Sequence, residues 1–441
     1  MEHPKIHLVS LGCPKNTVDS EHMLGLLGGN SYDFTSDPQQ ADVVIVNTCG
    51  FIGLAKEESV EAILHAHELR KTGICKGVIV TGCLAERYRF DLQKELADEA
   101  DEILTLNQEK DIVRYVDKIL GRSRQSYIDS TSRLQITPGH WSYLRISDGC
   151  DHQCAFCAIP LIKGPHRSEP VESLVSEAER LSASGVRELV LVAQDSVRYG
   201  KDLYDRYELL PLLQKLADVD GIEWMRLMYT YPAFWTDPLI DFFSVSPVMC
   251  NYIDMPLQHI ADPILARMKR ATTKRKTLDL IAKIRDSIPS VGLRSSFIVG
   301  FPGETDAHFE ELLEFLEVTR FDNATCFIYS HEEGTTAANL DKPVSEGIKE
   351  ERYRRFTDLQ DRISGEINLK FVRSRHIVLV DEHDKEKEYR GRMHRDAPEI
   401  DGSVVIRAPV GLGLKPGCFT EVEITGAYSY ELTAKALGPV W

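Results

Sequence analysis

Long apolar runs are missing from this sequence. Hydrophobic residues make up 43% of its 441 positions, which suffices for packed cores, yet no stretch reaches the length of a membrane-spanning helix. Near Met1, the residues Pro4, Lys5 and His7 interrupt any apolar segment, so we expect no signal peptide. These absences predict a cytoplasmic protein without a membrane partner.

An excess of basic residues is also missing. The chain carries 52 Lys plus Arg against 68 Asp plus Glu, a formal net charge of −16. Because proteins that coat nucleic acid usually present a basic surface, the composition argues against that class and leaves room only for local basic patches. The length predicts two or three domains.

Three regions differ in their pattern of apolar residues. In residues 1–122, short β-branched runs alternate with helical segments, which predicts a doubly wound α/β domain. A polar stretch at 123–140, with the breaker Pro138-Gly139, is interpreted as a linker. The expected strands of the first domain are 6–10, 43–46, 77–81 and 102–106.

Residues 141–371 continue the alternation and predict a partial (β/α)6 barrel, closed by a long charged helix at 345–370. Residues 372–441 turn to short strands separated by Gly, Pro and Asp, which fits a small all-β, OB-like barrel. The fold class is therefore α/β with a C-terminal β-barrel. The strands expected in these two regions are 143–147, 188–195, 225–231, 252–258, 293–301 and 325–330, then 377–380, 404–406, 420–424 and 430–434.

Three closely spaced cysteines, Cys150, Cys154 and Cys157, follow the first expected strand of the central domain. Clustered cysteines of an intracellular protein indicate metal ligands or catalysts, because cytosolic thiols stay reduced. A cubic iron–sulfur cluster has four irons, so three thiolates would hold it and leave one iron open for chemistry. The alternative is a structural zinc site with His152 or His166 as the fourth ligand, although no second Cys-x2-Cys pair is present.

A second set of cysteines, Cys13, Cys49 and Cys83, follows three expected strands of the first domain. The intervals are about the length of a βα repeat, so successive repeats bring each thiol to the same sheet edge, where a second cluster could be held. Small residues flank them and would let backbone amides approach cluster sulfurs. The alternative is that these are buried structural cysteines.

At these residues the chain resembles a known family. The spacing Cys-x3-Cys-x2-Cys at 150–157, preceded by a three-cysteine domain, is similar to the radical S-adenosylmethionine methylthiotransferases. Within that family the wording SLGCPKN at 10–16, VDSE at 18–21, VNTCGFI at 46–52 and DAPEIDG at 396–402 resembles the RimO branch. The loop KGPHRSEP at 163–170 departs from the family motif, so we leave its substrate contacts unassigned, although Lys163, His166 and Arg167 would suit an aspartate-containing substrate.

The resemblance implies two [4Fe-4S] clusters and S-adenosyl-L-methionine as cofactors. Cys150, Cys154 and Cys157 would hold the catalytic cluster that cleaves S-adenosylmethionine, and Cys13, Cys49 and Cys83 would hold a cluster that supplies or carries sulfur. The last region would be a TRAM domain, which binds the macromolecular substrate. At strand ends of the barrel, the expected contacts to S-adenosylmethionine are Phe156, Gln194, Gln258, Ser296 and Gly300. Each could instead be an ordinary packing or strand-capping residue.

The resemblance also implies a substrate and partners. The RimO branch inserts a methylthio group at the β-carbon of an aspartate in small-subunit ribosomal protein 12, and the related alternative is a tRNA adenosine next to the anticodon. We expect a monomer. Its partners would be an electron donor such as flavodoxin or ferredoxin, and a sulfur source. A non-catalytic alternative is a ribosome-binding protein with structural zinc sites.

Overall fold

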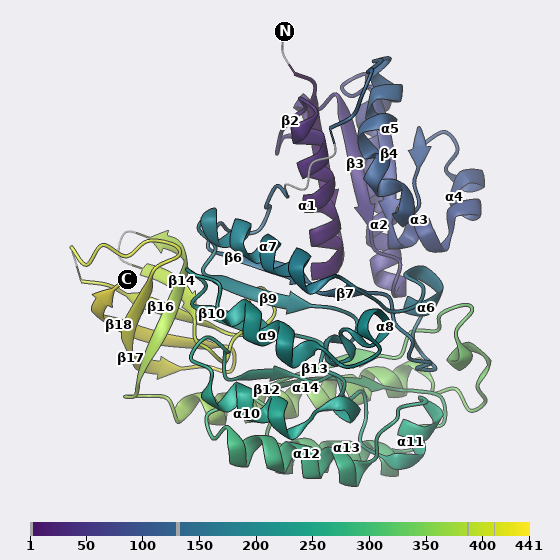
Figure 1. The fold of residues 1–441 in the computed structure, drawn as a ribbon. Coiled ribbons are helices and arrows are strands. Elements are labelled where there is room, and N and C mark those ends of the chain that lie inside the picture. Colours follow the sequence, from purple (N-terminus) through teal and green to yellow (C-terminus); the bar gives the residue numbers. More distant parts are fainter. Residues whose placement is uncertain (1–2, 129–132, 386–387, 410) are drawn as a thin grey trace.

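Three domains follow one another along the chain (Figure 1). A computed structural model describes residues 3–128, 133–385, 388–409 and 411–441. The first domain stands above the central one in this view, and the C-terminal barrel lies at the left side of the central domain. Of the expected linker at 123–140, residues 129–132 lie outside the described residues.

The first domain contains a parallel sheet with the strand order β2-β1-β3-β4-β5. Its core strands form because their residues are apolar and buried on both faces, as a parallel sheet requires. The edge strand β2 was not expected, because two residues are too few to show a period. The strands are β1 (Lys5–Ser10), β2 (Asp33–Phe34), β3 (Val43–Thr48), β4 (Gly77–Gly82) and β5 (Glu102–Ile103).

Helices cover both faces of this sheet. Val44 and Val46 pack with residues of α2, whereas Val43 and Ile45 pack with residues of α1 and α5. Successive strand residues point to opposite faces, so this division confirms the doubly wound prediction. The helices of the domain are α1 (Pro14–Gly29), α2 (Gly53–Lys71), α3 (Cys83–Arg87), α4 (Arg89–Glu95) and α5 (Ile112–Leu120), with 3-10 turns η1 (Pro38–Gln40) and η2 (Leu106–Asp111).

The central domain has all six expected parallel strands, arranged in chain order. They form two three-stranded sheets, β6-β9-β10 and β11-β12-β13, and an isolated bridge pairs Met225 of β10 with Met249, just before β11. The strands are β6 (Trp141–Arg145), β9 (Glu188–Val192), β10 (Trp224–Leu227), β11 (Tyr252–Asp254), β12 (Gly292–Val299) and β13 (Asn323–Ile328), and a short pair, β7 (Ser147–Asp148) and β8 (Arg167–Ser168), follows β6.

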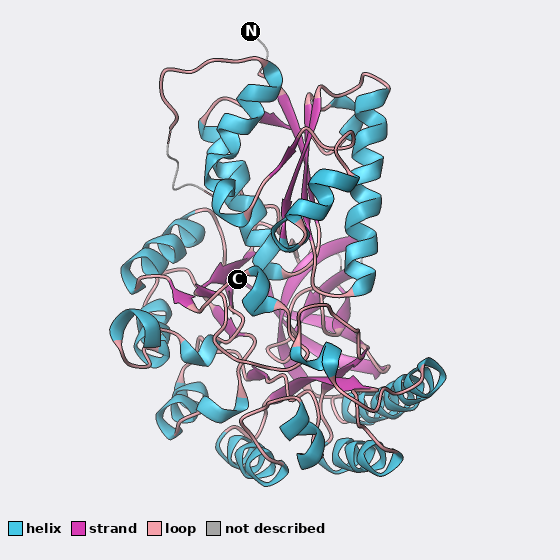
Figure 2. Ribbon diagram, turned by 90° about the vertical axis from the view of Figure 1, so that its right-hand side faces the viewer, coloured by secondary structure: helices cyan, strands magenta, loops and turns pink. Residues whose placement is uncertain are grey.

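Helices lie outside this curved sheet, as Figure 2 shows. The long helix α14 lies against β13 and agrees closely with the expected segment 345–370. The helices are α6 (Ile159–Ile162), α7 (Val171–Ala183), α8 (Lys201–Tyr204), α9 (Leu209–Ala217), α10 (Asp237–Val245), α11 (Asp262–Arg267), α12 (Lys274–Ser287), α13 (Asp306–Thr319) and α14 (Glu346–Leu369), with 3-10 turns η3 (Ser196–Arg198), η4 (Pro232–Phe234) and η5 (Thr336–Asn339).

The C-terminal domain is a closed barrel with the order β14-β15-β16-β18-β17. The sequence predicted four of these strands and missed β15, because its residues are mostly polar. The strands are β14 (Arg375–Lys385), β15 (Glu388–Arg392), β16 (Ser403–Arg407), β17 (Phe419–Ala427) and β18 (Glu431–Val440).

The loop after β15 reaches back to the central sheet. Tyr143 donates a hydrogen bond to Glu399 (2.7 Å), and Tyr252 donates one to Asp401 (2.7 Å). The motif at 396–402 therefore joins the barrel to the central domain. The expected linker is also anchored where it is described, because Arg133 pairs with Glu21 and with Glu177 (2.6 Å each).

Candidate active site

The first cysteine set lies at the carboxyl ends of three adjacent strands. Cys13 follows β1, Cys49 directly follows β3 and Cys83 directly follows β4. Thr48 and Gly82 are register partners, so Cys49 and Cys83 leave the sheet at the same level. The order of the strands reverses between β1 and β3, and ligands of open α/β sheets bind at such a switch point.

Asn16 ties these three strand ends together. Its amide nitrogen donates to the carbonyls of Leu11 (2.9 Å) and Thr48 (3.0 Å), and its oxygen lies 3.8 Å from the Sγ of Cys83. Gly12 has a φ of +93°, and a Cβ there would lie 2.9 Å from the Cβ of Cys49. A polar anchor and a glycine thus let the three cysteine segments approach one another.

The second cysteine set lies in the loop between β7 and α6, beyond the carboxyl end of β6. Backbone bonds hold this loop from two sides: Cys150 N–H donates to Gly164 (3.1 Å), and Ala155 N–H donates to Met268 (2.9 Å). Gly149 has a φ of +74°, and a Cβ there would lie 2.1 Å from the carbonyl oxygen of Pro165. Contacts between backbone segments therefore set the shape of this loop.

Arg270 contacts the second cysteine set directly. Its Nη1 lies within hydrogen-bond distance of the Sγ of Cys154 (3.5 Å), and its guanidinium lies 4.0 Å from the centroid of the Tyr231 ring. The same ring stacks at 4.2 Å on the imidazole of His152, which pairs with Asp195 (2.6 Å). Arg270 was not identified from the sequence, because it lies more than a hundred residues from the cysteines in the chain and matches no ligand spacing.

The two cysteine sets meet at the domain interface. Cys83 packs in one small buried cluster with Ala158 and Ile162. Ala158 directly follows Cys157 of the second set. Helices α3 and α6, which begin at or just after these cysteines, also contact one another. The structure therefore brings together two cysteine sets that lie far apart in the sequence.

The thiols fit a cationic metal group. Burial raises the pKa of Cys150 to about 11 and of Cys157 to about 12, and burial beside Cys13 and Cys49 raises the pKa of Cys83 above its usual range. Buried thiols ionise only where positive charge compensates them, which iron supplies. No three His, Cys, Asp or Glu of the described residues are placed to share one metal ion, as a single zinc site would require, whereas the thiolates of a cubic cluster each bind a different iron.

The two histidines of the zinc alternative have other partners. His152 pairs with Asp195, and the Nε2 of His166 lies 3.2 Å from the hydroxyl of Ser168. Each contact uses the Nε2 atom, and the Nδ1 of His166 has no hydrogen-bond partner among the described residues. The four remaining cysteines are buried: Cys75, Cys250, Cys326 and Cys418.

Three of the expected S-adenosylmethionine contacts follow strand ends, whereas Ser296 lies within β12 and Phe156 lies in the cysteine loop. Gln194 follows β9 and donates to Asp148 (2.8 Å), while Gln258 follows β11 and donates from its backbone to Ser296 (2.8 Å). Gly300 follows β12 with a φ of +73°, and a Cβ there would lie 2.3 Å from Lys349, so packing against that lysine already requires a glycine. Phe156 is half-buried against the core cluster that includes Ala155. The assignment of these residues to the cofactor stays a prediction.

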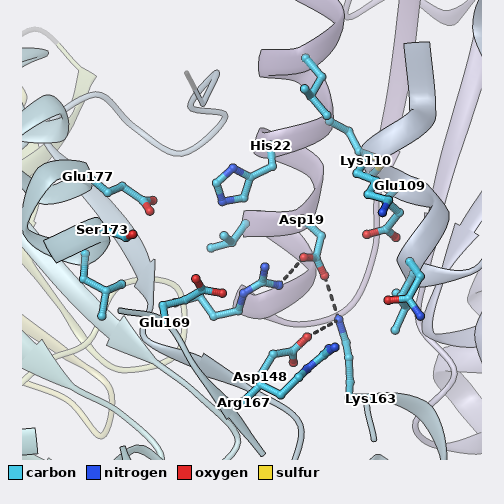
Figure 3. A pocket seen from close by; sticks show the side chains of 17 residues that line it. Asp19, His22, Glu109, Lys110, Asp148, Lys163, Arg167, Glu169, Ser173 and Glu177 are labelled. Atoms are coloured by element: carbon cyan, nitrogen blue, oxygen red, sulfur yellow. Dashed lines mark hydrogen bonds and ion pairs between the residues drawn. The ribbon is translucent and has the colours of Figure 1, made fainter. Parts of the chain in front are cut away.

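A charged cavity of 380 Å³ opens beside the cysteine sets, between α1 and the central domain (Figure 3). Lys163 pairs there with Asp19 (2.9 Å) and Asp148 (3.4 Å), and Arg145 also pairs with Asp19. Burial alone would raise the pKa of Asp19, but the two cations outweigh it and lower the pKa to about 2. Lys163, which the sequence suggested for the substrate, is thus engaged inside the protein, and no sequence signal indicated Asp19 as its partner.

No helix within the described ranges is both long and apolar enough to cross a membrane.

Three family models match the chain in the order of its domains. Residues 5–105 match the uncharacterized protein family UPF0004, residues 144–316 the radical SAM superfamily, and residues 374–437 the TRAM domain. These matches agree with the architecture: a doubly wound domain, a partial barrel and a closed C-terminal barrel.

Curated relatives match over nearly the full length. The ribosomal protein uS12 methylthiotransferase RimO of Desulforamulus reducens is 46% identical over 97% of this chain and 98% of its own. The protein of the same name from Trichlorobacter lovleyi is 43% identical, covering 98% of both chains. Among solved structures, the radical S-adenosylmethionine methyltransferase TsrM from Kitasatospora setae has a TM-score of 0.56 at 12% identity, over 82% of this chain and 89% of its own, a likeness of fold alone.

Proposed function

Since the chain belongs to the RimO family of S-adenosylmethionine-dependent methylthiotransferases, we propose that it inserts a methylthio group at the β-carbon of an aspartate in small-subunit ribosomal protein 12. The observation that carries this proposal is the meeting of the two cysteine sets, with Cys83 in one buried cluster with Ala158 and Ile162. A reaction that first makes a radical and then transfers sulfur needs both cysteine sets close enough to act on the same substrate carbon.

In this proposal Cys150, Cys154 and Cys157 hold one [4Fe-4S] cluster, and Cys13, Cys49 and Cys83 hold the other. When bound, these groups supply the electron that cleaves S-adenosylmethionine and the sulfur that is transferred. The chain supplies the rest. Arg270 positions the thiolate of Cys154 through its 3.5 Å contact, and Asn16 keeps the three strand ends of the first set together.

S-adenosylmethionine would lie against Gln194, Gln258 and Gly300 after three strands, Ser296 within β12 and Phe156 in the cysteine loop. Support comes from their common side of the barrel, since functional loops of βα barrels gather at the carboxyl ends of strands. A protein reductant such as flavodoxin or ferredoxin, a separate sulfur source and a monomeric state remain predictions.

The test compares two substrates in cells that lack the gene. Intact-mass analysis of ribosomal protein 12 should show the loss of one methylthio group, and nucleoside analysis of tRNA should show no change. Restoring the gene should restore the modification. If tRNA loses a methylthio group while ribosomal protein 12 keeps its own, the tRNA alternative is correct and the proposal is wrong.

A further inference from the structure

Lys15 is a buried cation between the two halves of the candidate site. It is only 8% exposed, and it lies in the first turn of α1, two residues after Cys13. Its ammonium lies 3.4 Å from the centroid of the Tyr229 ring, which comes just after β10 of the central domain. The side chain thus reaches from the first cysteine set to the strand ends of the barrel.

The ammonium of Lys15 has no carboxylate partner among the described residues. Seven Lys and Arg residues of this part of the chain are buried, and the other six each pair with a carboxylate: Lys163, Arg226, Lys349, Arg352, Arg392 and Arg395. A buried charge is costly unless it is paired, and a ring face compensates only part of that cost. Lys15 therefore stands out as a cation that still lacks its anion.

Two carboxylates of this region are already engaged. Asp254 accepts hydrogen bonds from Arg294 (3.0 Å) and from the backbone N–H of Tyr229 (2.9 Å). Asp19, one turn further along α1, is paired with Arg145 and Lys163. Neither carboxylate is within ion-pair distance of Lys15. The Cys13 thiol also acts on Lys15, but as a cluster ligand it would share its negative charge with iron, so a carboxylate from outside the chain would complete the pairing of this ammonium.

Two further features favour an anion at this position. The N-terminus of α1 carries no side-chain cap from Cys13, and the helix dipole there attracts negative charge. Pro14 has no N–H, and the N–H groups of Asn16 and Thr17 bond the Cys13 carbonyl, so the dipole and the Lys15 ammonium supply this attraction. Tyr229, which holds the ammonium, has a φ of +58°, a left-handed conformation that bulky residues rarely adopt. Such strain concentrates at binding and catalytic sites.

We propose that Lys15, together with the N-terminus of α1, binds the carboxylate of the substrate aspartate. The inference rests on the proposed function, because it takes the ribosomal protein as the substrate. The β-carbon of an aspartate is bonded to this carboxylate, so an ammonium two residues from Cys13 would hold the reacting carbon next to the first cysteine set. The uncharged base of an adenosine would leave Lys15 unpaired, so the same residue selects the protein substrate.

The experiment is a double-mutant cycle on binding. The reconstituted holoenzyme and its Lys15→Met variant are each titrated with ribosomal protein 12 and with ribosomal protein 12 whose target aspartate is changed to asparagine. For the wild-type enzyme, the asparagine should weaken binding about 10- to 100-fold, the usual effect of removing a charged hydrogen-bond partner. For Lys15→Met the two substrates should bind within about twofold of one another, and Lys15→Arg should restore part of the preference.

A surface variant and two cluster measurements separate carboxylate binding from a general loss of structure. Lys94→Met removes a lysine of the same domain whose side chain is 81% exposed, and it should keep the full preference for aspartate. Iron content and the visible spectrum are measured for every variant, and Lys15→Met should match the wild type in both.

Two results would overturn the inference. One is a Lys15→Met enzyme with an intact preference for aspartate. The other is weaker binding of S-adenosylmethionine without any change in that preference, because Lys15 would then bind the cofactor's carboxylate. If the wild-type enzyme modifies tRNA and not ribosomal protein 12, the proposed function itself is wrong, and Lys15 has no substrate aspartate to bind.

Discussion

The ammonium of Lys163 lies 2.9 Å from the Oδ2 of Asp19, and this contact joins the segment after one cysteine set to the helix after the other. Both groups are buried, and Asp148 and Arg145 complete the network. The charges of these four residues therefore neutralise one another, and their contacts fix the first domain on the central one.

Changing Lys163 to Met should destabilise the protein by about 3 kcal/mol or more, because it leaves buried carboxylates without one of their cations. Urea unfolding followed by fluorescence measures the change. Lys201→Met is the matched control, because Lys201 pairs with Asp205 at the surface (2.8 Å) and should contribute less than about 1 kcal/mol. Equal effects of the two substitutions would contradict the structural role of the network.

Changing Arg270 to Met should make the reduction potential of the cluster at Cys154 more negative. Hydrogen bonds to ligand sulfurs stabilise the reduced state, and Arg270 supplies both a donor and a positive charge there. A redox titration followed by electron paramagnetic resonance measures the midpoint. Arg275→Met, at a side chain that is 91% exposed, should leave the midpoint where it is in the wild type. An unchanged midpoint in Arg270→Met would show that the contact has no electronic role.

The two cysteine sets should be separable by mutation. We expect Cys154→Ala to abolish cleavage of S-adenosylmethionine, measured as deoxyadenosine released, because it removes a ligand of the cleaving cluster. Cys49→Ala should retain this cleavage and lose transfer of sulfur to ribosomal protein 12, measured by mass spectrometry. Loss of cleavage in both variants to the same extent would refute this division of labour.

Glu109 should make stability depend on pH. Burial, aided by the negative charge of Asp19, raises the pKa of this carboxyl from near 4.5 to about 8. The folded state then holds the proton more tightly than the unfolded chain, so this contribution to stability is complete below about pH 4.5 and is lost as the pH rises to about 8.

Replacing Glu109 with Gln removes this titration. The stability of Glu109→Gln relative to the wild type should therefore increase between pH 5 and pH 9, which thermal denaturation at a series of pH values can follow. Glu95→Gln, at a side chain that is 69% exposed, should show no such trend. A constant difference between Glu109→Gln and wild type across this range would contradict the assignment.

Strand positions were predictable where burial imposed a simple pattern. All six strands of the central domain were expected, because parallel strands covered on both faces are continuous apolar runs. Their ends were less accurate: the expected strand at 252–258 stops at Asp254, since Pro256 lacks an N–H and Gln258 has a φ of +73°. The polar strand β15 gave no such pattern.

The sequence by itself determined the two cysteine sets, the repeating βα units and the family, because ligand spacing and apolar pattern depend on residues that are close in the chain. Only the tertiary structure decided that Lys15 lies against Tyr229 with no carboxylate partner in the described part of the chain, that Lys163 pairs with Asp19, and that Arg270 contacts Cys154. Each of these contacts joins residues from different domains or distant loops. Such pairs follow no sequence period, so they become visible only when the packed domains bring them together.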